Sequence, residues 1–472
     1  ITAEEANNQG TSHGPWVAGV LNSGGTLIIN GGTFSNDNFG ENALATAARG
    51  AILADTKAKV EINGGTFNVL KNVIDIQNNL GDANNNPSVV LSGGTYNADP
   101  RISAQYASNL ITLADGYVAV ENNGVWTVVK AAAKIGEQKF KTITAAIEAA
   151  VLMTGDVTIE ILAGTYAEDI NLTNAAVTVG DANARPNITF KPAAGANVTL
   201  AGTTTLGYYQ RGVGASRWKG NVTFEGINFD HAANATNSLD IQDVSGIYLV
   251  NCTLTGDGEY GITSSAGTST SNAAFTGCTF NTGAMQVLGQ LGAHLVVDGC
   301  TCNEFSFNIQ GGMAPGMTIK NTTFNLTLTD AHVGESFYAV RTNACPVNIQ
   351  ETKINVDSEV SSVAADQAKW AIFYARKESN AKWAVSDCEV NLTDAALAQT
   401  GLMLTKNDAT NYTNAADRIV VTGLTSTSNN VADLALRAAG CATVNGVKYK
   451  DGSLDLTGKV ASVNGVYYET LA

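Results

Sequence analysis

Proline, histidine and basic residues are scarce in this chain. Its 472 residues include 7 prolines and 4 histidines, and 27 lysines and arginines face 42 aspartates and glutamates, which gives a formal net charge of −15. A nucleic-acid binder needs surplus positive charge on at least one face, so this balance argues against a nucleic-acid partner. No run approaches the roughly 18 apolar residues of a membrane-spanning helix. We therefore expect no membrane insertion of this segment, and the acidic balance suits a self-repelling surface protein.

The 7 cysteines show no metal-binding pattern. There is no Cys-x-x-Cys pair and no Cys/His group with the spacing of metal ligands, and Cys300-Thr301-Cys302 is only a Cys-x-Cys. The histidines, at positions 13, 231, 294 and 332, are scattered along the chain. The sequence therefore predicts no metal and no cofactor.

Glycine, in contrast, is abundant at 48 residues, and it marks a repeat. Three early segments each combine a strand pattern, a glycine-containing bend and a second short strand. They are Leu27–Phe34 (LIINGGTF), Val60–Phe67 (VEINGGTF) and Val89–Tyr96 (VVLSGGTY). Recurrence of one unit at this interval predicts a solenoid.

The later chain keeps this pattern while changing its residues. The further copies are 222–229, 248–254, 274–280, 295–302, 317–324, 347–354, 383–390 and 419–426. Superposed, all copies share one slot that accepts only small or apolar residues. It holds Gly32, Gly65, Gly94, Ile227, Cys252, Cys278, Cys300, Thr322, Thr352, Cys388 and Leu424. Equivalent side chains of parallel strands stack about 4.8 Å apart, so we expect an inward-facing bend filled by free thiols. A disulfide or a ligand site is the alternative.

Residues 134–170 interrupt the repeat. Ile143, Ala146, Ile147 and Ala150 form a helical apolar stripe, which predicts a short helix near 142–151 with Thr142 or Thr144 as its N-cap. The residues Phe-x-Thr-Ile-x-x-Ala-Ile, from 140, and Ile-x-x-Gly-Thr-Tyr-x-Glu-x-Ile, from 161, resemble the entrance of pectin-lyase-like β-helices, including pectin methylesterases. With the preceding Lys-Ile-Gly, the stretch is similar to tandem modules of bacterial surface and adhesin-like proteins.

The resemblance implies an all-β chain folded as a right-handed parallel β-helix, with two consecutive modules and a capping helix at the start of the second. Residues 1–130 are expected to be the C-terminal part of a first module, and residues 131–460 the second module. Residues 461–472 align with 133–144 at apolar, aromatic and threonine positions, which predicts the start of a further module of the same polypeptide.

The catalytic motifs of the resembled enzymes are missing. The Gly-x-x-Asp-Phe sequence of pectin methylesterases has no match, and the nearest acidic cluster is Asp230 with Asp240 and Asp243. Acidic side chains at such edges are more often solvated turn residues than calcium ligands or general bases. We therefore expect a non-enzymatic extracellular or cell-surface stalk or adhesin that binds a polysaccharide or host glycan. The alternatives are a polysaccharide lyase, esterase or hydrolase, and a self-assembling structural component.

Two groups of side chains are candidate ligand contacts. The insertion 206–219 concentrates aromatic and arginine residues that could stack on sugars or, alternatively, pack against the repeats. They are Tyr208, Tyr209, Arg211, Arg217 and Trp218. The second group is a basic strip expected on successive repeats, suited to uronate or sulfate groups or, alternatively, a solvated face. It comprises Gln310, Arg341, Arg376, Lys377 and Lys406.

Overall fold

The protein is all-β, with long sheets of parallel strands. The computed structural model describes residues 20–35, 51–68, 73–76, 82–102, 110–210, 214–230, 239–256, 261–264, 272–287, 294–309, 316–332, 337–342, 345–361, 370–376, 382–406, 419–436, 441–450, 453–456, 458–463 and 466–468. None of the helices in this described part has the length and hydrophobicity needed to span a bilayer.

The chain divides into two compact units, Ile1–Ala146 and Ile147–Ala472. The expected module boundaries at 130/131 and 460/461 remain predictions. In the first unit the parallel strands form three sets. These are β1 (Val20–Ser23), β4 (Ile52–Asp55) and β7 (Ile74–Ile76); β2 (Thr26–Ile29), β5 (Lys59–Ile62), β8 (Ser88–Leu91) and β10 (Ile111–Leu113); and β3 (Thr33–Ser35), β6 (Thr66–Asn68) and β9 (Thr95–Tyr96). The predicted repeats are in register, because Phe34, Phe67 and Tyr96 stack with ring centroids 4.8 and 4.9 Å apart.

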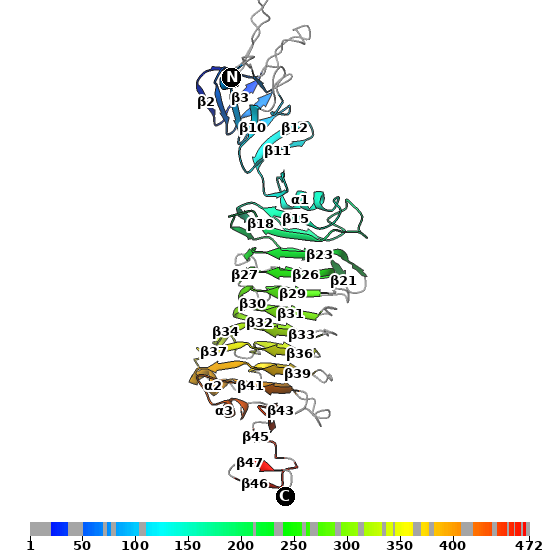
Figure 1. The fold of residues 1–472 in the computed structure, drawn as a ribbon, viewed down its shortest axis with the longest axis vertical. Coiled ribbons are helices and arrows are strands. Elements are labelled where there is room, and N and C mark those ends of the chain that lie inside the picture. The colour runs from blue at the N-terminus through cyan, green and yellow to red at the C-terminus, as the bar shows by residue number, and fades with distance from the viewer. Residues whose placement is uncertain are drawn as a thin grey trace, which may run out of the picture. The chain divides into compact units, whose positions relative to one another are not determined.

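In the second unit each repeat supplies strands to three parallel stacks, and Figure 1 shows successive strands of the first stack following one another in order. The first stack contains β15 (Val157–Ile161), β18 (Ile188–Pro192), β23 (Trp218–Glu225), β26 (Val244–Val250), β29 (Asn272–Thr276), β31 (His294–Asp298), β33 (Met317–Lys320), β36 (Val347–Gln350), β39 (Trp383–Ser386), β42 (Ile419–Thr422) and β43 (Cys441–Val444).

The other two stacks share the long strands β30 (Thr279–Val287) and β32 (Thr301–Ile309). The second stack also contains β16 (Gly164–Tyr166), β19 (Val198–Leu200), β24 (Asn228–Asp230), β27 (Thr253–Thr255), β34 (Thr323–Leu328), β37 (Lys353–Ser358) and β40 (Glu389–Leu392). The third stack adds β17 (Ile170–Leu172), β20 (Thr204–Leu206), β25 (Leu239–Ile241), β28 (Ile262–Ser264), β35 (Val340–Thr342), β38 (Ala371–Arg376) and β41 (Gly401–Lys406).

The remaining elements are short helices and antiparallel hairpins. The helices are α1 (Ile143–Ala150), α2 (Asp394–Gln399), α3 (Val431–Leu436), η1 (Ala83–Asn85) and η3 (Asp330–His332). The hairpins are β11 (Tyr117–Asn122) with β12 (Val125–Lys130), β13 (Ala133–Ile135) with β14 (Gln138–Phe140), β21 (Tyr208–Gln210) with β22 (Gly214–Ser216), β43 with β44 (Val447–Lys450), to which β45 (Ser453–Leu454) is added, and β46 (Ala461–Val463) with β47 (Val466–Tyr468). Helix α1 lies where it was predicted, and Thr142 is its N-cap, because Thr142 Oγ1 accepts a hydrogen bond from the Ala145 N–H at 3.1 Å.

The hairpin at 461–468 repeats the one at 133–140. Ala133 pairs with Phe140 and Ile135 with Gln138, while Ala461 pairs with Tyr468 and Val463 with Val466. The two hairpins therefore share strand lengths and register, as the sequence alignment of these segments leads one to expect. A further module beginning here remains a prediction.

The bend between the first and second stacks has the same backbone conformation in repeat after repeat. A residue with positive φ, between 47° and 65°, occupies it at Gly226, Asn251, Gly277, Gly299, Asn321, Glu351, Asp387 and Gly423. The residue that follows is buried, and these residues are Ile227, Cys252, Cys278, Cys300, Thr322, Thr352, Cys388 and Leu424. The predicted inward-facing slot is therefore confirmed in the second unit. In the first unit it is wrong, because Gly32 is exposed, Gly65 and Gly94 are half-buried, and these glycines themselves have positive φ.

The thiols in this slot are buried and free. Hydrogen bonding to Cys252 raises the pKa of the Cys278 thiol to about 12, and burial raises the pKa of Cys345 to about 12. Six cysteines are free and buried in the described residues, and no group of three or more metal-binding side chains occurs there. The same hydrogen bond with Cys278 lowers the pKa of Cys252. Enclosed thiols pack as small apolar side chains, which agrees with the predicted role of the slot cysteines as core filler.

Glu351 is an unfavourable residue for its bend, because φ of +47° suits glycine or asparagine better than a longer side chain. We expect Glu351→Asn to raise the free energy of unfolding by about 0.5–1 kcal/mol. Urea denaturation followed by circular dichroism would measure it. Gln350→Asn, one residue earlier in β36, is the control and should give no gain. Equal midpoints for Glu351→Asn and the unmodified chain would contradict this account of the bend.

Candidate functional site

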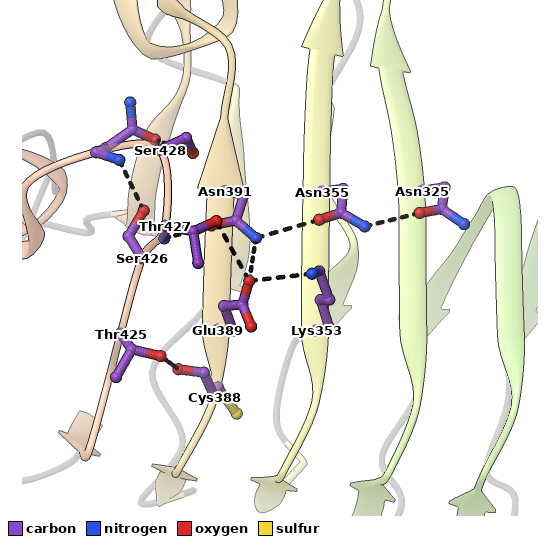
Figure 2. A network of polar contacts seen from close by, with 11 residues as sticks. Asn325, Lys353, Asn355, Cys388, Glu389, Asn391, Thr425, Ser426, Thr427 and Ser428 are labelled. Atoms are coloured by element: carbon purple, nitrogen blue, oxygen red, sulfur yellow. Dashed lines mark hydrogen bonds and ion pairs between the residues drawn. The ribbon is translucent and has the colours of Figure 1, made fainter.

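A continuous row of hydrogen-bonded side chains, one threonine followed by five asparagines, crosses the second stack. The row, called here the asparagine ladder, consists of Thr255, Asn281, Asn303, Asn325, Asn355 and Asn391, which are register partners on β27, β30, β32, β34, β37 and β40. Each asparagine donates from Nδ2 to the oxygen of the preceding member, at 3.3, 3.0, 2.9, 2.9 and 3.3 Å in chain order. Figure 2 shows its C-terminal part, from Asn325 to Asn391.

The ladder forms because parallel strands place identical side chains one strand spacing apart, about 4.8 Å, which an amide can bridge. Thr427 ends it, since both its N–H and its Oγ1 donate to Asn391 Oδ1 at 2.8 Å. Asn391 Nδ2 also donates to Glu389 Oε1 at 2.5 Å, so the bonding capacity of Asn391 is filled. Asn325 and Asn355 each keep one N–H and one carbonyl lone pair beyond the ladder bonds.

A groove of about 330 Å³ lies beside the ladder. Its lining residues are Glu304, Asn325, Leu326, Thr327, Asn355, Val356, Asp357, Asn391, Leu392, Thr393 and Ser428. The ladder amides form one edge, and Thr327, Asp357 and Thr393, two residues further along each strand, form the other. Leu326, Val356 and Leu392 lie between the two edges and are almost fully buried. Because side chains alternate along a strand, these three residues point into the core, and the strand backbone lies between the two polar edges of the groove.

The groove is acidic. Glu304 accepts hydrogen bonds from the N–H and Oγ1 of Thr327 at 2.9 and 2.7 Å, and Asp357 Oδ1 accepts from Thr393 Oγ1 at 2.9 Å. Among the described residues, none that lines the groove is basic. Lys353, on the strand that carries Asn355, pairs with Glu389 at 3.1 Å, and hydrogen bonds from Asn391 and Lys353 lower the pKa of that carboxyl. The two carboxylates in the groove therefore keep an uncompensated negative charge.

Breaking the ladder in its middle should weaken the fold measurably. Asn355→Ala removes the bond that Asn355 donates to Asn325 and the bond that it accepts from Asn391, so we expect a loss of about 1–2 kcal/mol in the free energy of unfolding. Chemical denaturation followed by circular dichroism would test this. Thr255→Val, at the start of the ladder, removes only the one ladder bond that Thr255 accepts from Asn281 and should cost less.

The residues predicted in the 206–219 insertion have different environments. Tyr208 and Tyr209 lie in β21, and the Arg217 carbonyl accepts a hydrogen bond from Asn174 Nδ2 at 3.1 Å. Trp218 is fully buried, with the guanidinium of Arg185 4.9 Å from its ring centre, so its ring packs inside the second unit. Arg211 lies outside the described residues. The alternative of packing against the repeats therefore describes Trp218.

The residues of the predicted basic strip do not all occupy the same register position on successive strands. Arg376 and Lys406 are register partners on β38 and β41, as expected, but Arg341 pairs with Tyr374 and is offset from them by two residues. The Arg341 guanidinium lies between the rings of Tyr338 and Tyr374, at 5.5 and 5.3 Å from their centres. Gln310 and Lys377 lie outside the described residues. Arg341 is therefore held by aromatic rings, a contact that the sequence reading did not foresee.

The predicted acidic cluster is divided between two stacks. Asp230 lies in β24 of the second stack, next to Thr255, whereas Asp240 lies in β25 of the third stack. Asp240 accepts hydrogen bonds from Gln242 at 2.6 Å and from Thr263 at 3.1 Å. Asp243 is buried, at 1% exposure. Asp240 is thus bonded at both oxygens to neutral side chains, and the described residues place no metal-binding group of three here.

His332 gives the protein a titratable group near neutral pH. Burial lowers the imidazole pKa of His332, and the Glu304 carboxylate opposes this shift only in part. When the ring is neutral, Nδ1 accepts a hydrogen bond from the Thr329 N–H at 3.0 Å. Because the folded pKa lies below the unfolded value, the unfolded chain binds the proton more tightly. The contribution of neutral His332 to stability is therefore fully present above about pH 6.5 and is lost as the pH drops below that value.

We expect His332→Asn to flatten this acid dependence, because an amide oxygen replaces Nδ1 as the acceptor and does not titrate in this range. Melting temperatures measured between about pH 7.5 and pH 5 would show the difference. His294→Asn, at the start of β31, is the matched control. If the melting temperature of His332→Asn fell with pH as steeply as that of the unmodified chain, His332 would be excluded as the source of the acid dependence.

No protein-family model matches the chain, and no match is found among curated proteins or solved structures. The function therefore has to be inferred from the side chains themselves. The ladder residues are the ones that the sequence reading missed, although a signal was present. Asparagine directly follows the last residue of five successive repeat copies, at 281, 303, 325, 355 and 391.

Proposed function

We propose that the second unit is a right-handed parallel β-helix of the pectin-lyase-like kind. Three parallel stacks that each receive strands from successive repeats support this, since a chain returning to the same three stacks winds as a coil. Connections between parallel strands of one sheet are right-handed in nearly all known cases, which gives the hand. A crystal structure in which the connections were left-handed would contradict the proposal.

We further propose that the protein is a non-enzymatic, extracellular surface module, a stalk or adhesin, that binds a glycan in the groove beside the asparagine ladder. The groove itself carries this proposal, because its two rows of hydrogen-bond donors and acceptors, one on each side of the strand backbone, can bond the hydroxyl rim of a sugar ring. Its two carboxylates, Glu304 and Asp357, accept hydrogen bonds from Thr327 and Thr393, which supports a binding role for them rather than a role as a catalytic acid and base.

Affinity gel electrophoresis of the whole chain through polysaccharide-containing gels tests the proposal, together with assays for released sugar fragments. We expect retardation by at least one polysaccharide and no fragment release. Asn355→Ala should lose the retardation, whereas Asn63→Ala, which breaks the bond to Asn30 in the first unit, should keep it. Fragment release would overturn the non-enzymatic assignment. Unchanged mobility in every polysaccharide and glycan tested would overturn glycan binding.

A further inference from the structure

The two edges of the groove repeat with the strands, which makes the site periodic. Asn325 and Asn355 lie on one edge, Thr327 and Asp357 on the other, and each pair recurs one strand further on. Five successive repeats contribute lining residues, from Glu304 on β32, through β34, β37 and β40, to Ser428 after β42. A ligand that uses such a site fully must itself be a repeating polymer.

We propose, on the basis of the proposed glycan binding, that the groove takes an unbranched, uncharged polysaccharide in an extended conformation, lying across the strands with one sugar beside each repeat. Neighbouring strands are about 4.8 Å apart. A sugar in an extended, equatorially linked chain advances by nearly the same distance. Neighbouring sugars in such a chain are turned by about half a rotation, so each brings its opposite hydroxyl edge to the ladder, and amides that both donate and accept can bond either edge.

The amides on the ladder edge suit the hydroxyls of such a chain. Asn325 and Asn355 each present one N–H and one carbonyl lone pair from the same planar group, so each can donate to one hydroxyl and accept from its neighbour on a sugar ring. The ladder bonds already fix the orientation of these amides, so little side-chain entropy is lost on binding. The polar edge is thus arranged before the ligand arrives.

The negative charge of the groove favours neutral polymers over acidic ones. Glu304 and Asp357 line the groove without a basic residue, and Lys353 is engaged by Glu389. A uronate or sulfate group would bring a like charge against these carboxylates, while a neutral hydroxyl can donate to the remaining carboxylate lone pairs. The groove therefore excludes the acidic glycans that the basic strip of Arg341, Arg376 and Lys377 was expected to bind.

Titration calorimetry of the whole chain with neutral β-1,4-linked oligosaccharides of increasing length, and with oligogalacturonates, tests the inference. The affinity for at least one neutral series should rise with each added sugar and stop rising at about five, because five repeats line the groove. Oligogalacturonates should bind at least about tenfold more weakly. An affinity that does not depend on length, or a preference for the acidic series, would overturn the inference.

Variants distinguish a failure of this inference from a failure of glycan binding in general. Asn355→Ala should weaken neutral binding about tenfold, with Asn63→Ala in the first unit as the matched ladder control. The double variant Glu304→Gln/Asp357→Asn keeps the shape of the groove and removes both charges. It should reduce the difference in affinity between neutral oligosaccharides and oligogalacturonates. Glycan binding that is unchanged in Asn355→Ala, together with an unchanged preference for neutral sugars in the Glu304→Gln/Asp357→Asn variant, would leave a glycan binder but contradict this site. Absence of all glycan binding would sink the proposed function as well.

Discussion

Gly207→Ala is expected to lower the free energy of unfolding by about 3–5 kcal/mol, among the largest effects of a single methyl group in this protein. Gly207 follows β20 at φ +71°, and an added Cβ would lie 1.8 Å from the carbonyl oxygen of Asp243. That oxygen is held in place because it accepts a hydrogen bond from the Trp218 N–H at 2.9 Å, while the Asp243 N–H donates to Leu206. The backbone therefore has little freedom to relieve the clash.

Gly195→Ala separates this clash from backbone strain alone. Gly195 has φ +73°, almost the same as Gly207, but nothing lies within 4 Å of its added Cβ. We expect it to cost about 1 kcal/mol. Thermal and urea unfolding followed by circular dichroism would give both values. Equal losses for the two alanine variants would show that the close approach to Asp243 has no energetic weight.

Trp218→Ala is expected to be similarly damaging, at about 3–5 kcal/mol. The indole ring is fully buried and is among the largest enclosed side chains of the described residues. Arg185, itself only 6% exposed, places its guanidinium 4.9 Å from the ring centre and donates to the carbonyls of Val177 and Val179 at 2.7 and 2.6 Å. Removing the ring would leave a cavity and take away a cation–π contact of about 1 kcal/mol from a buried charge.

Trp218→Phe is the matched variant. The Trp218 Nε1–H is buried and has no hydrogen-bond partner in the described part of the chain, so phenylalanine gives up no hydrogen bond and keeps an aromatic face toward Arg185. We expect it to cost less than about 1.5 kcal/mol. Unfolding midpoints of both variants, with glycan retardation measured in parallel, would test this. A folded, stable Trp218→Ala that lost only glycan binding would favour the earlier interpretation of Trp218 as a sugar platform.

The core was predictable from sequence because its periodicity is strict. Cys252, Cys278 and Cys300 could be superposed from the flanking strand patterns alone, and all three occupy the same buried bend. The short helix at 143–150 was predictable for a similar reason, since its apolar stripe and threonine cap are local signals. Such features follow from spacing, and spacing is what a sequence displays directly.

The candidate site was less accessible, because it depends on which strands become neighbours and in what register. Arg341 was placed on the face of Arg376, yet inserted residues between repeats shift its partner to Tyr374. For Trp218 the sequence left two alternatives, stacking on sugars or packing against the repeats, because its contacts with Arg185 and Asp243 involve residues distant in sequence. The asparagines looked compositional in an asparagine-rich chain, and only the strand register shows that their amides meet.

The antiparallel hairpin that follows the last parallel strand of the first stack affects the behaviour of the protein at high concentration. β44 covers β43, and β45 adds only the two exposed residues Ser453 and Leu454. A row of open backbone N–H and C=O groups invites a second copy to continue the sheet, and a short, reversed final strand offers few of them. A second copy would have to extend the sheet from this short final strand, so the described edge offers a poor template for aggregation.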